Sequence, residues 1–290
     1  MGESDDGRES ARSMSATGTL RHPADQFERT ISHRSRGSHF RYIRPDHLGR
    51  VVKPFVYFDL FDKDGPEMMF GLHPHSGIAT VTHVFEGAID YTDPDGTSGT
   101  VLPGGVEWMM AGKGMWHGGG AVEGRVAGFQ LWIAMPPELE LAPYESSYWQ
   151  AEDIETDGPA RVLMGRLGAA RGKFAADLPI TLLTVKLVAG ESWRFTPPGG
   201  QEVLWIGVSK GALSAPDRVV TGELVIFDRS ENGVTFKAKT ETLFVLGAST
   251  LHDHELAVGH YSVHTNRDAL VEGERHIQEL GTELRRNGRL

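Results

Sequence analysis

The sequence contains no cysteine. This excludes disulfide bridges, thiolate metal ligands, cysteine-ligated iron–sulfur clusters and a cysteine nucleophile, so any metal ion must be held by nitrogen or oxygen atoms. The sequence also lacks a run of about 18 apolar residues that could span a bilayer, and its N-terminus lacks the apolar core of a secretory signal. We therefore expect a cytoplasmic protein without a membrane partner.

Basic residues are outnumbered by acidic ones. The chain has 29 Lys and Arg against 39 Asp and Glu, which gives a formal net charge of −10. Direct binding to nucleic acid is not expected, because phosphate contacts need clustered Lys and Arg. A Gly-rich phosphate loop and a Gly-x-Ser-x-Gly nucleophile elbow are also missing. A small-molecule ligand or substrate is therefore the expected partner.

Glycine, by contrast, is abundant, and the sequence pattern predicts short strands joined by turns. It has 36 Gly and 15 Pro among 290 residues, which favours a mainly β protein long enough for two domains. Strand-like runs at residues 51–60 and 78–85 belong to a first series, and a second series begins after Arg161. The halves share this rhythm without a visible sequence repeat, so a duplicated barrel is inferred from the strands alone.

The two chain ends differ from the strand-rich middle. The N-terminal residues are polar and poor in large apolar side chains, which predicts a disordered leader. Near the C-terminus, Leu270, Ile277, Leu280 and Leu284 have the spacing of an amphipathic helix. The predicted organisation is a leader at 1–25, a first barrel at 26–150, a second barrel at 160–265, and a helix and tail at 266–290.

Three histidines form the most informative pattern. His73 and His75 lie in Gly71-Leu-His-Pro-His-Ser-Gly, and His117 follows Gly112-Lys-Gly-Met-Trp. In an extended segment, side chains two residues apart point to the same side, so His73 and His75 can present imidazoles to one ion. Three neutral imidazoles suit Fe, Ni, Cu or Zn. A surface His-x-His without any metal remains the alternative, because the chain has 13 histidines.

A series of motifs around these histidines resembles the N-terminal domain of the pirin family. The resemblance covers residues 40–150 well and the C-terminal half loosely. The motifs are Pro54-Phe-Val-Tyr-Phe-Asp-Leu-Phe, His73-Pro-His-Ser-Gly, Thr80-Val-Thr-His-Val-Phe-Glu-Gly, Trp108-Met-Met-Ala-Gly-Lys-Gly, His117 and Gln130-Leu-Trp-Ile.

The resemblance implies an all-β fold of two cupin-type (jelly-roll) β-barrels in one chain, a bicupin, with a C-terminal helix. It also implies a divalent metal, iron first, with Ni, Cu, Zn or Mn as alternatives, held by His73, His75, His117 and a glutamate two residues later. This chain has Gly119 at that fourth position, and Ala79 where the family motif carries a glutamate. Either a three-histidine site still works, or the site has lost its chemistry. We expect Gly119→Glu to tighten divalent metal binding by adding an anionic ligand.

Several residues are candidates for the surroundings of such a site. We expect Phe70, His83, Trp116 and Gly119 to line its pocket, with His83 facing the same interior as Ala79, or else acting as a hydrogen-bonded core histidine. Glu107 and Glu123 are expected to reach the site only if loops fold back. A second His-x-His, His252 and His254, is interpreted as a solvated strand end. Catalytic residues are not identified by the sequence.

The resemblance implies an oxidoreductase similar to pirin-like proteins that cleave quercetin with dioxygen. A phenolic or enediol molecule would then be the substrate. Two alternatives remain open. One is a metal-sensing or regulatory protein that acts through a protein partner, and the other is a metal-free bicupin.

Overall fold

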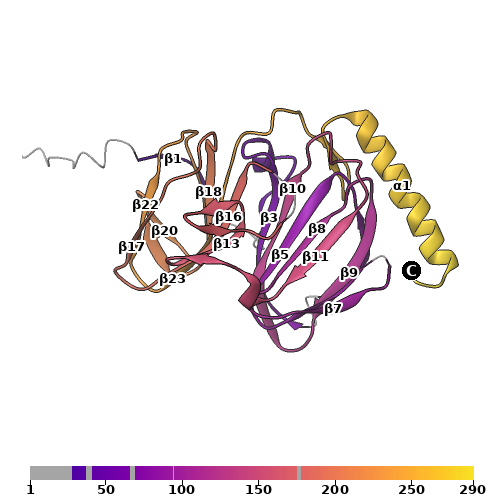
Figure 1. Ribbon diagram of the computed structural model, residues 1–290, viewed down its shortest axis with the longest axis horizontal. Helices are drawn as coiled ribbons and strands as arrows, with labels where there is room; N and C mark the ends of the chain where they lie inside the picture. The colour runs from indigo at the N-terminus through magenta and orange to yellow at the C-terminus, as the bar shows by residue number, and fades with distance from the viewer. Residues whose placement is uncertain (1–27, 37–40, 66–68, 94, 175–177) are drawn as a thin grey trace, which may run out of the picture.

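The computed structural model describes residues 28–36, 41–65, 69–93, 95–174 and 178–290. In this part of the chain, two β-barrels lie side by side, and one helix packs against the outer side of the first barrel (Figure 1). The leader predicted at residues 1–25 lies outside the described residues. No helix in the described ranges is long and apolar enough to cross a membrane.

The first barrel is made of a six-stranded and a four-stranded antiparallel sheet. The larger sheet has the strand order β11 (Glu145–Trp149), β8 (Val106–Met110), β5 (Ile78–Glu86), β10 (Arg125–Ala134), β3 (Phe55–Asp64) and β2 (Arg41–Ile43). The smaller sheet has the order β4 (Met69–His75), β9 (Met115–Ala121), β6 (Ile89–Thr92) and β7 (Ser98–Val101). A 3-10 turn, η2 (Leu48–Arg50), precedes β3.

The second barrel is built in the same way from a seven-stranded and a four-stranded sheet. The larger sheet has the order β1 (Ile31–Arg36), β21 (Glu223–Phe227), β18 (Val203–Lys210), β23 (Thr242–Ser249), β16 (Ile180–Leu187), β13 (Ala160–Met164) and β12 (Thr156–Asp157). The smaller has the order β17 (Ser192–Phe195), β22 (Val234–Ala238), β19 (Ala212–Ser214) and β20 (Arg218–Val220). Short pieces complete the chain: η4 (Ala151–Asp153), the pair β14 (Arg166–Leu167) and β15 (Ala170–Arg171), and the pair β24 (Ala257–Val258) and β25 (Val263–His264).

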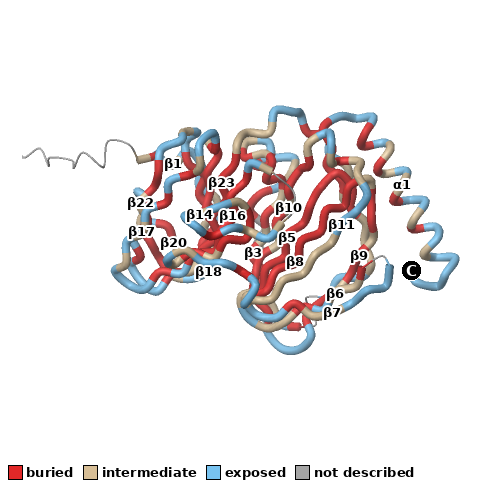
Figure 2. The backbone as a smooth tube through the Cα atoms, in the orientation of Figure 1, coloured by how far each residue is buried: buried red, intermediate tan, exposed pale blue. Residues whose placement is uncertain are grey.

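The two large sheets pack face to face in the middle of the molecule. The ring of Trp205 lies 4.6 Å from that of Phe58 and 5.4 Å from that of Phe55. Both large sheets contribute to this continuous apolar core, which includes Ala79 and Val81 of β5, and Figure 2 shows the buried backbone concentrated there. Because side chains alternate along a strand, the intervening Thr80 and Thr82 face the interior of the first barrel.

The interiors of the two barrels differ in chemistry. The second is filled by apolar side chains such as Phe195, Phe236 and Phe244. The first buries polar and ionisable groups, among them His75, His117 and Glu107. Filling with large apolar side chains stabilises a barrel but leaves no ligands. Among the described residues, only the first barrel therefore offers an interior suited to binding an ion.

The first described strand belongs to the second barrel, and the segment before the C-terminal helix belongs to the first barrel. β1 pairs with β21 of the second barrel, although a first barrel was expected at residues 26–150. After β23 the chain returns to the first barrel, where Ser262 bridges Ser76, although residues up to 265 were expected in the second. The spacing of strand-like runs and turns in the sequence locates the strands. It does not show which sheet each strand joins, because the pairing partner is distant in sequence.

The helix α1 (Arg267–Arg286) closes the chain against β9 and β4. Its N-cap is Asn266, whose side chain accepts a hydrogen bond from the Ala269 amide at 2.9 Å, as expected for this residue type. Ile277 is buried as predicted, but Gly273 and Gly281 also lie on the buried face. These glycines let the helix approach closely: a Cβ at Gly281 would lie 2.6 Å from the Trp116 ring.

Candidate metal centre

The three histidines singled out in the sequence lie together. His73 and His117 face each other in the β4–β9 register, and His75 is on the same side of β4 as His73. Ring centroids are 4.5 Å apart for His73 and His117, 5.0 Å for His73 and His75, and 5.3 Å for His75 and His117. One nitrogen from each ring lies within 4.8 Å of the others. Antiparallel pairing therefore builds the cluster from two segments about 40 residues apart.

Two of the imidazoles are oriented by backbone carbonyls. The Nδ1 atom of His73 lies 2.9 Å from the Gly71 oxygen, and that of His75 lies 3.1 Å from the Tyr261 oxygen. A carbonyl accepts only from a protonated Nδ1, so the Nε2 atom of each ring carries the free lone pair. The Nε2 atoms of His75 and His117 are buried and form no hydrogen bond with any residue that the structure describes. Unpartnered buried nitrogens next to each other fit a metal ion.

Burial keeps the two strand-β4 imidazoles neutral. Desolvation, with the neighbouring His117 as the next cause, lowers the pKa of His73 to about 4. The pKa of His75 is lowered well below its ordinary value by desolvation and by the other two imidazoles. Metal ions bind the neutral form, and protons compete for the same lone pair. At neutral pH both rings are therefore ready to act as ligands.

A pair of stacked aromatic rings lies beside His75. The ring of Trp132 lies 4.9 Å from that of His75, and Tyr57 stacks on Trp132 at 4.6 Å. His75 and His117 are 0% and 6% exposed, whereas His73 is only partly buried. The cluster is therefore approached from the side of His73, where the ring of Phe70 lies 6.4 Å away.

Glu107 lies beside the cluster without any loop folding back. It is the second residue of β8, its side chain is 7% exposed, and its Oε1 atom lies 3.7 Å from Nδ1 of His117. The next residue, Trp108, points to the other side of the sheet, where it stacks on Phe174 at 4.8 Å. The signal in the sequence was a single carboxylate inside an apolar strand, Val106-Glu-Trp-Met-Met, which alternation directs into a barrel.

His83 and Ala79 share one face of β5, as expected, but it is the face opposite to the metal cluster. Ala79 belongs to the core between the barrels, so its lack of a carboxylate removes nothing from the histidine cluster. His83 is buried, its Nδ1 lies 2.8 Å from the Gly105 oxygen, and its ring packs on Phe129 at 5.7 Å. The expected pocket role of His83 is therefore corrected to that of a hydrogen-bonded core histidine. Alternation along the strand shows that Ala79 and His83 share a face of β5. It does not show whether that face points into the first barrel or toward the second.

Trp116 also points away from the cluster. It alternates with the buried His117 on β9, and its Nε1 donates to the Ile277 oxygen of α1 at 2.8 Å. The structure therefore places Trp116 beneath the helix and not in a pocket around the histidines. The reason is the same alternation along a strand that brings His117 inward.

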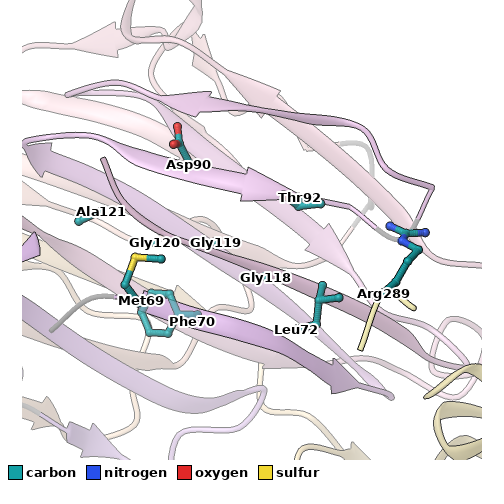
Figure 3. Close-up of a pocket in the computed structure, with 10 residues that line it drawn as sticks. All are labelled: Met69, Phe70, Leu72, Asp90, Thr92, Gly118, Gly119, Gly120, Ala121 and Arg289. Carbon is teal, nitrogen blue, oxygen red and sulfur yellow. The ribbon is translucent and has the colours of Figure 1, made fainter. Parts of the chain in front are cut away.

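Phe70 and Gly119 line a groove of about 450 Å³ on the outer surface of the smaller sheet (Figure 3). Asp90 and Thr92 of β6 pair with Gly120 and Gly118, so both point outward while Tyr91 points inward. The full lining is Met69, Phe70, Leu72, Asp90, Thr92, Gly118, Gly119, Gly120, Ala121 and Arg289.

Gly119 has no room for a side chain. A Cβ there would lie 2.1 Å from the backbone oxygen of Asp90, so any substitution requires β6 and β9 to move apart. Glycine within a strand typically marks such a close backbone approach. The expectation that Gly119→Glu simply adds a ligand therefore does not fit this backbone.

The remaining candidates lie elsewhere. His252 and His254 are in the loop before β24, with ring centroids 5.4 Å apart, and within the described ranges they gain no third ligand. Glu123 is exposed in the turn between β9 and β10.

Comparison with known proteins agrees with this architecture. A model of the Pirin family matches residues 35–133. A Pseudomonas aeruginosa protein provisionally named quercetin 2,3-dioxygenase is 32% identical over 235 residues, which are 74% of this chain and 82% of that protein. The chain belongs to the pirin family.

Two solved structures show that this pirin has the bicupin fold. A quercetin 2,3-dioxygenase from Acinetobacter baumannii superposes with a TM-score of 0.80 at 22% identity, over 87% of this chain and 97% of that chain. A bacterial pirin from Escherichia coli in complex with nickel(II) superposes with a TM-score of 0.60 at 19% identity, over 77% and 98%.

Proposed function

We propose that this pirin is a metal-dependent oxidoreductase, a dioxygenase of phenolic or enediol substrates of the quercetin type. One observation carries the proposal: three imidazoles converge in the polar barrel, and the buried Nε2 atoms of His75 and His117 have no hydrogen-bond partner in the described part of the chain. The name of the Pseudomonas relative supports the substrate class. Fold likeness by itself is a weaker warrant for chemistry.

The ion that fits is divalent and belongs to the Fe, Ni, Cu, Zn and Mn series. His73, His75 and His117 would hold it through Nε2, and iron is the first choice, since a set of imidazole ligands with open positions suits dioxygen chemistry. The nickel(II) complex of the Escherichia coli pirin supports a divalent ion of this series. When bound, the ion would supply positive charge that favours the deprotonated form of a phenol or enediol.

The chain's own residues would bind and orient the substrate. The partly exposed edge of His73, flanked by Phe70, is the side from which a flat molecule can approach. The stacked pair of Trp132 and Tyr57 packs on the His75 side of the cluster, where it would limit the access of water. Exclusion of water strengthens electrostatic interactions within such a site.

Oxygen uptake tests the proposal directly. Protein loaded with Fe(II) is incubated with quercetin or a smaller enediol, and dioxygen and substrate are followed together. We expect their coupled consumption, with loss of about 100-fold or more in His117→Gln and little change in the loop variant His252→Gln. Metal bound in full without dioxygen consumption would contradict the enzyme and favour a regulatory protein that acts through a partner.

A further inference from the structure

Glu107 is a buried carboxylate with no Lys or Arg partner among the residues that the structure describes. Its side chain is 7% exposed, and its ion-pair partner is the imidazole of His117. Across the described residues, no Lys or Arg lies within ion-pair distance of it, and no hydrogen bond to its carboxylate is formed. A carboxylate is seldom buried in this way unless a positive charge lies nearby. Its position next to the histidine cluster indicates where that charge belongs.

We propose that Glu107 is the positioning carboxylate of the metal centre, and that it acts on the ion through His117. This inference rests on the metal site of the proposed function, but not on its substrate. Gly119 provides no carboxylate at the position expected from the sequence, and Ala79 faces the other way. Glu107 supplies the negative charge from a third strand, β8.

The geometry favours a role behind the imidazole over direct ligation. Oε1 of Glu107 lies nearest to Nδ1 of His117, at 3.7 Å, whereas the nitrogen of that ring that is fully buried without a hydrogen bond to any described residue is Nε2. His73 and His75 already have an oxygen at Nδ1, from Gly71 and Tyr261. Glu107 completes this pattern, so each of the three rings has an oxygen behind it.

The charge of Glu107 gives this third anchor a particular effect. A shift of about 1 Å brings the carboxylate to the ~2.8 Å typical of a charge-assisted hydrogen bond with Nδ1–H. Such a bond fixes the tautomer of His117 and makes the lone pair of its Nε2 a stronger ligand for the metal ion. The centre thereby gains an anionic contribution while every coordination position not used by a histidine stays open to substrate and water.

Metal affinity tests the role of Glu107 separately from activity. Co(II) is titrated into apo wild type, Glu107→Gln and Asp93→Asn, and both the dissociation constant and the visible d–d spectrum are recorded. Asp93 is the matched control, because it is a second buried carboxylate of the first barrel but bonds to Ser146 and Tyr148. We expect affinity to fall by about 10- to 100-fold in Glu107→Gln and by less than about 3-fold in Asp93→Asn. The spectrum of saturated Glu107→Gln should show the same ligand set as wild type.

The possible results separate the two proposals. Equal affinity of wild type and Glu107→Gln would overturn the role of Glu107, as would a saturated variant that has lost one oxygen ligand, which would make Glu107 a direct ligand. Failure of wild type itself to bind Co(II) would contradict the proposed function. If Glu107→Gln does not fold, Glu107→Asp keeps the charge but shortens the reach. Its affinity should also fall by about 10-fold or more, and wild-type affinity there would overturn the inference.

Discussion

His75 shows at the scale of a single residue how the site depends on distant parts of the chain. Its Nδ1 is held by the backbone oxygen of Tyr261, which is 186 positions away in the sequence. The spacing of His73, His75 and His117 could be interpreted from the sequence because strand alternation is a local rule. The carbonyl behind His75 could not, since a backbone oxygen leaves no trace in residue identity.

His83 should make the free energy of unfolding depend on pH below about pH 6.5. Burial is the main reason why its pKa is lowered to about 4, against about 6.5 in an unfolded chain. Between these values the unfolded state binds a proton that the folded state does not, so stability is present above pH 6.5 and is lost as pH falls. We expect His83 to account for about 2 kcal/mol of the decrease in unfolding free energy between pH 6.5 and pH 5.

Chemical denaturation of the apoprotein at pH 7 and pH 5 measures this loss. The comparison is with His83→Leu, which removes the titrating group from surroundings that include Phe85 and Phe129. The variant should lose about 2 kcal/mol less than wild type between the two pH values. An identical loss in both proteins would show that His83 titrates normally.

At the scale of elements, the close approach of β9 and β6 determines what the first barrel can hold. Gly119 lies between Tyr91 on β6 and Phe70 on β4, with the backbone oxygen of Asp90 occupying the place of a Cβ. The resemblance to the pirin family marked Gly119 as an unusual position. It could not reveal the close contact, because strand spacing here depends on three strands together.

Gly119→Ala is expected to lower the free energy of unfolding by about 1–3 kcal/mol, because β6 must move to accept a methyl group. Gly71→Ala is the matched control: it is a glycine of the same sheet, and its Cβ would meet nothing within 4 Å. Denaturant unfolding of the two variants measures the difference. Equal stability of both variants would mean that the strands adjust freely at Gly119. Gly119→Glu could then add a fourth ligand, as the sequence predicted.

At the scale of the whole molecule, the crossing of the chain ends makes the two barrels one unit. β1 completes a sheet of the second barrel, and the segment after β23 wraps around the first. The fold class and the final helix followed from strand rhythm, turn residues and the resemblance of motifs. The exchange of ends did not, because nothing local in residues 31–36 distinguishes a strand of one barrel from a strand of the other.

A buried polar network holds the segment between β23 and α1, here called the returning segment, against the first barrel. The carboxylate of Glu140 accepts hydrogen bonds from the amide and hydroxyl of Thr265, both at 2.7 Å, and lies 3.1 Å from Nδ1 of His264. Nε2 of His264 lies 3.0 Å from the hydroxyl of Ser76, the residue after His75. This network therefore connects the end of the chain to the strand that carries two of the three imidazoles.

Removal of the central carboxylate should weaken both the fold and the site. We expect Glu140→Ala to lower the unfolding free energy by about 3 kcal/mol, since it leaves three buried donors without an acceptor. Metal affinity should fall with it, because Tyr261 then orients His75 less well. Glu138→Ala, two residues earlier and exposed, serves as the control. Unchanged metal affinity in a measurably destabilised Glu140→Ala would show that the returning segment does not support His75.

The metal centre itself is tested most directly by metal analysis and X-ray absorption spectroscopy of protein purified without an affinity tag and loaded with Fe(II). We expect about one ion per chain, an inner shell with three imidazole nitrogens at about 2.0–2.2 Å, and loss of the ion in His117→Gln. A protein that stays free of metal after loading, or whose metal content is the same in His117→Gln, would contradict a centre formed by His73, His75 and His117.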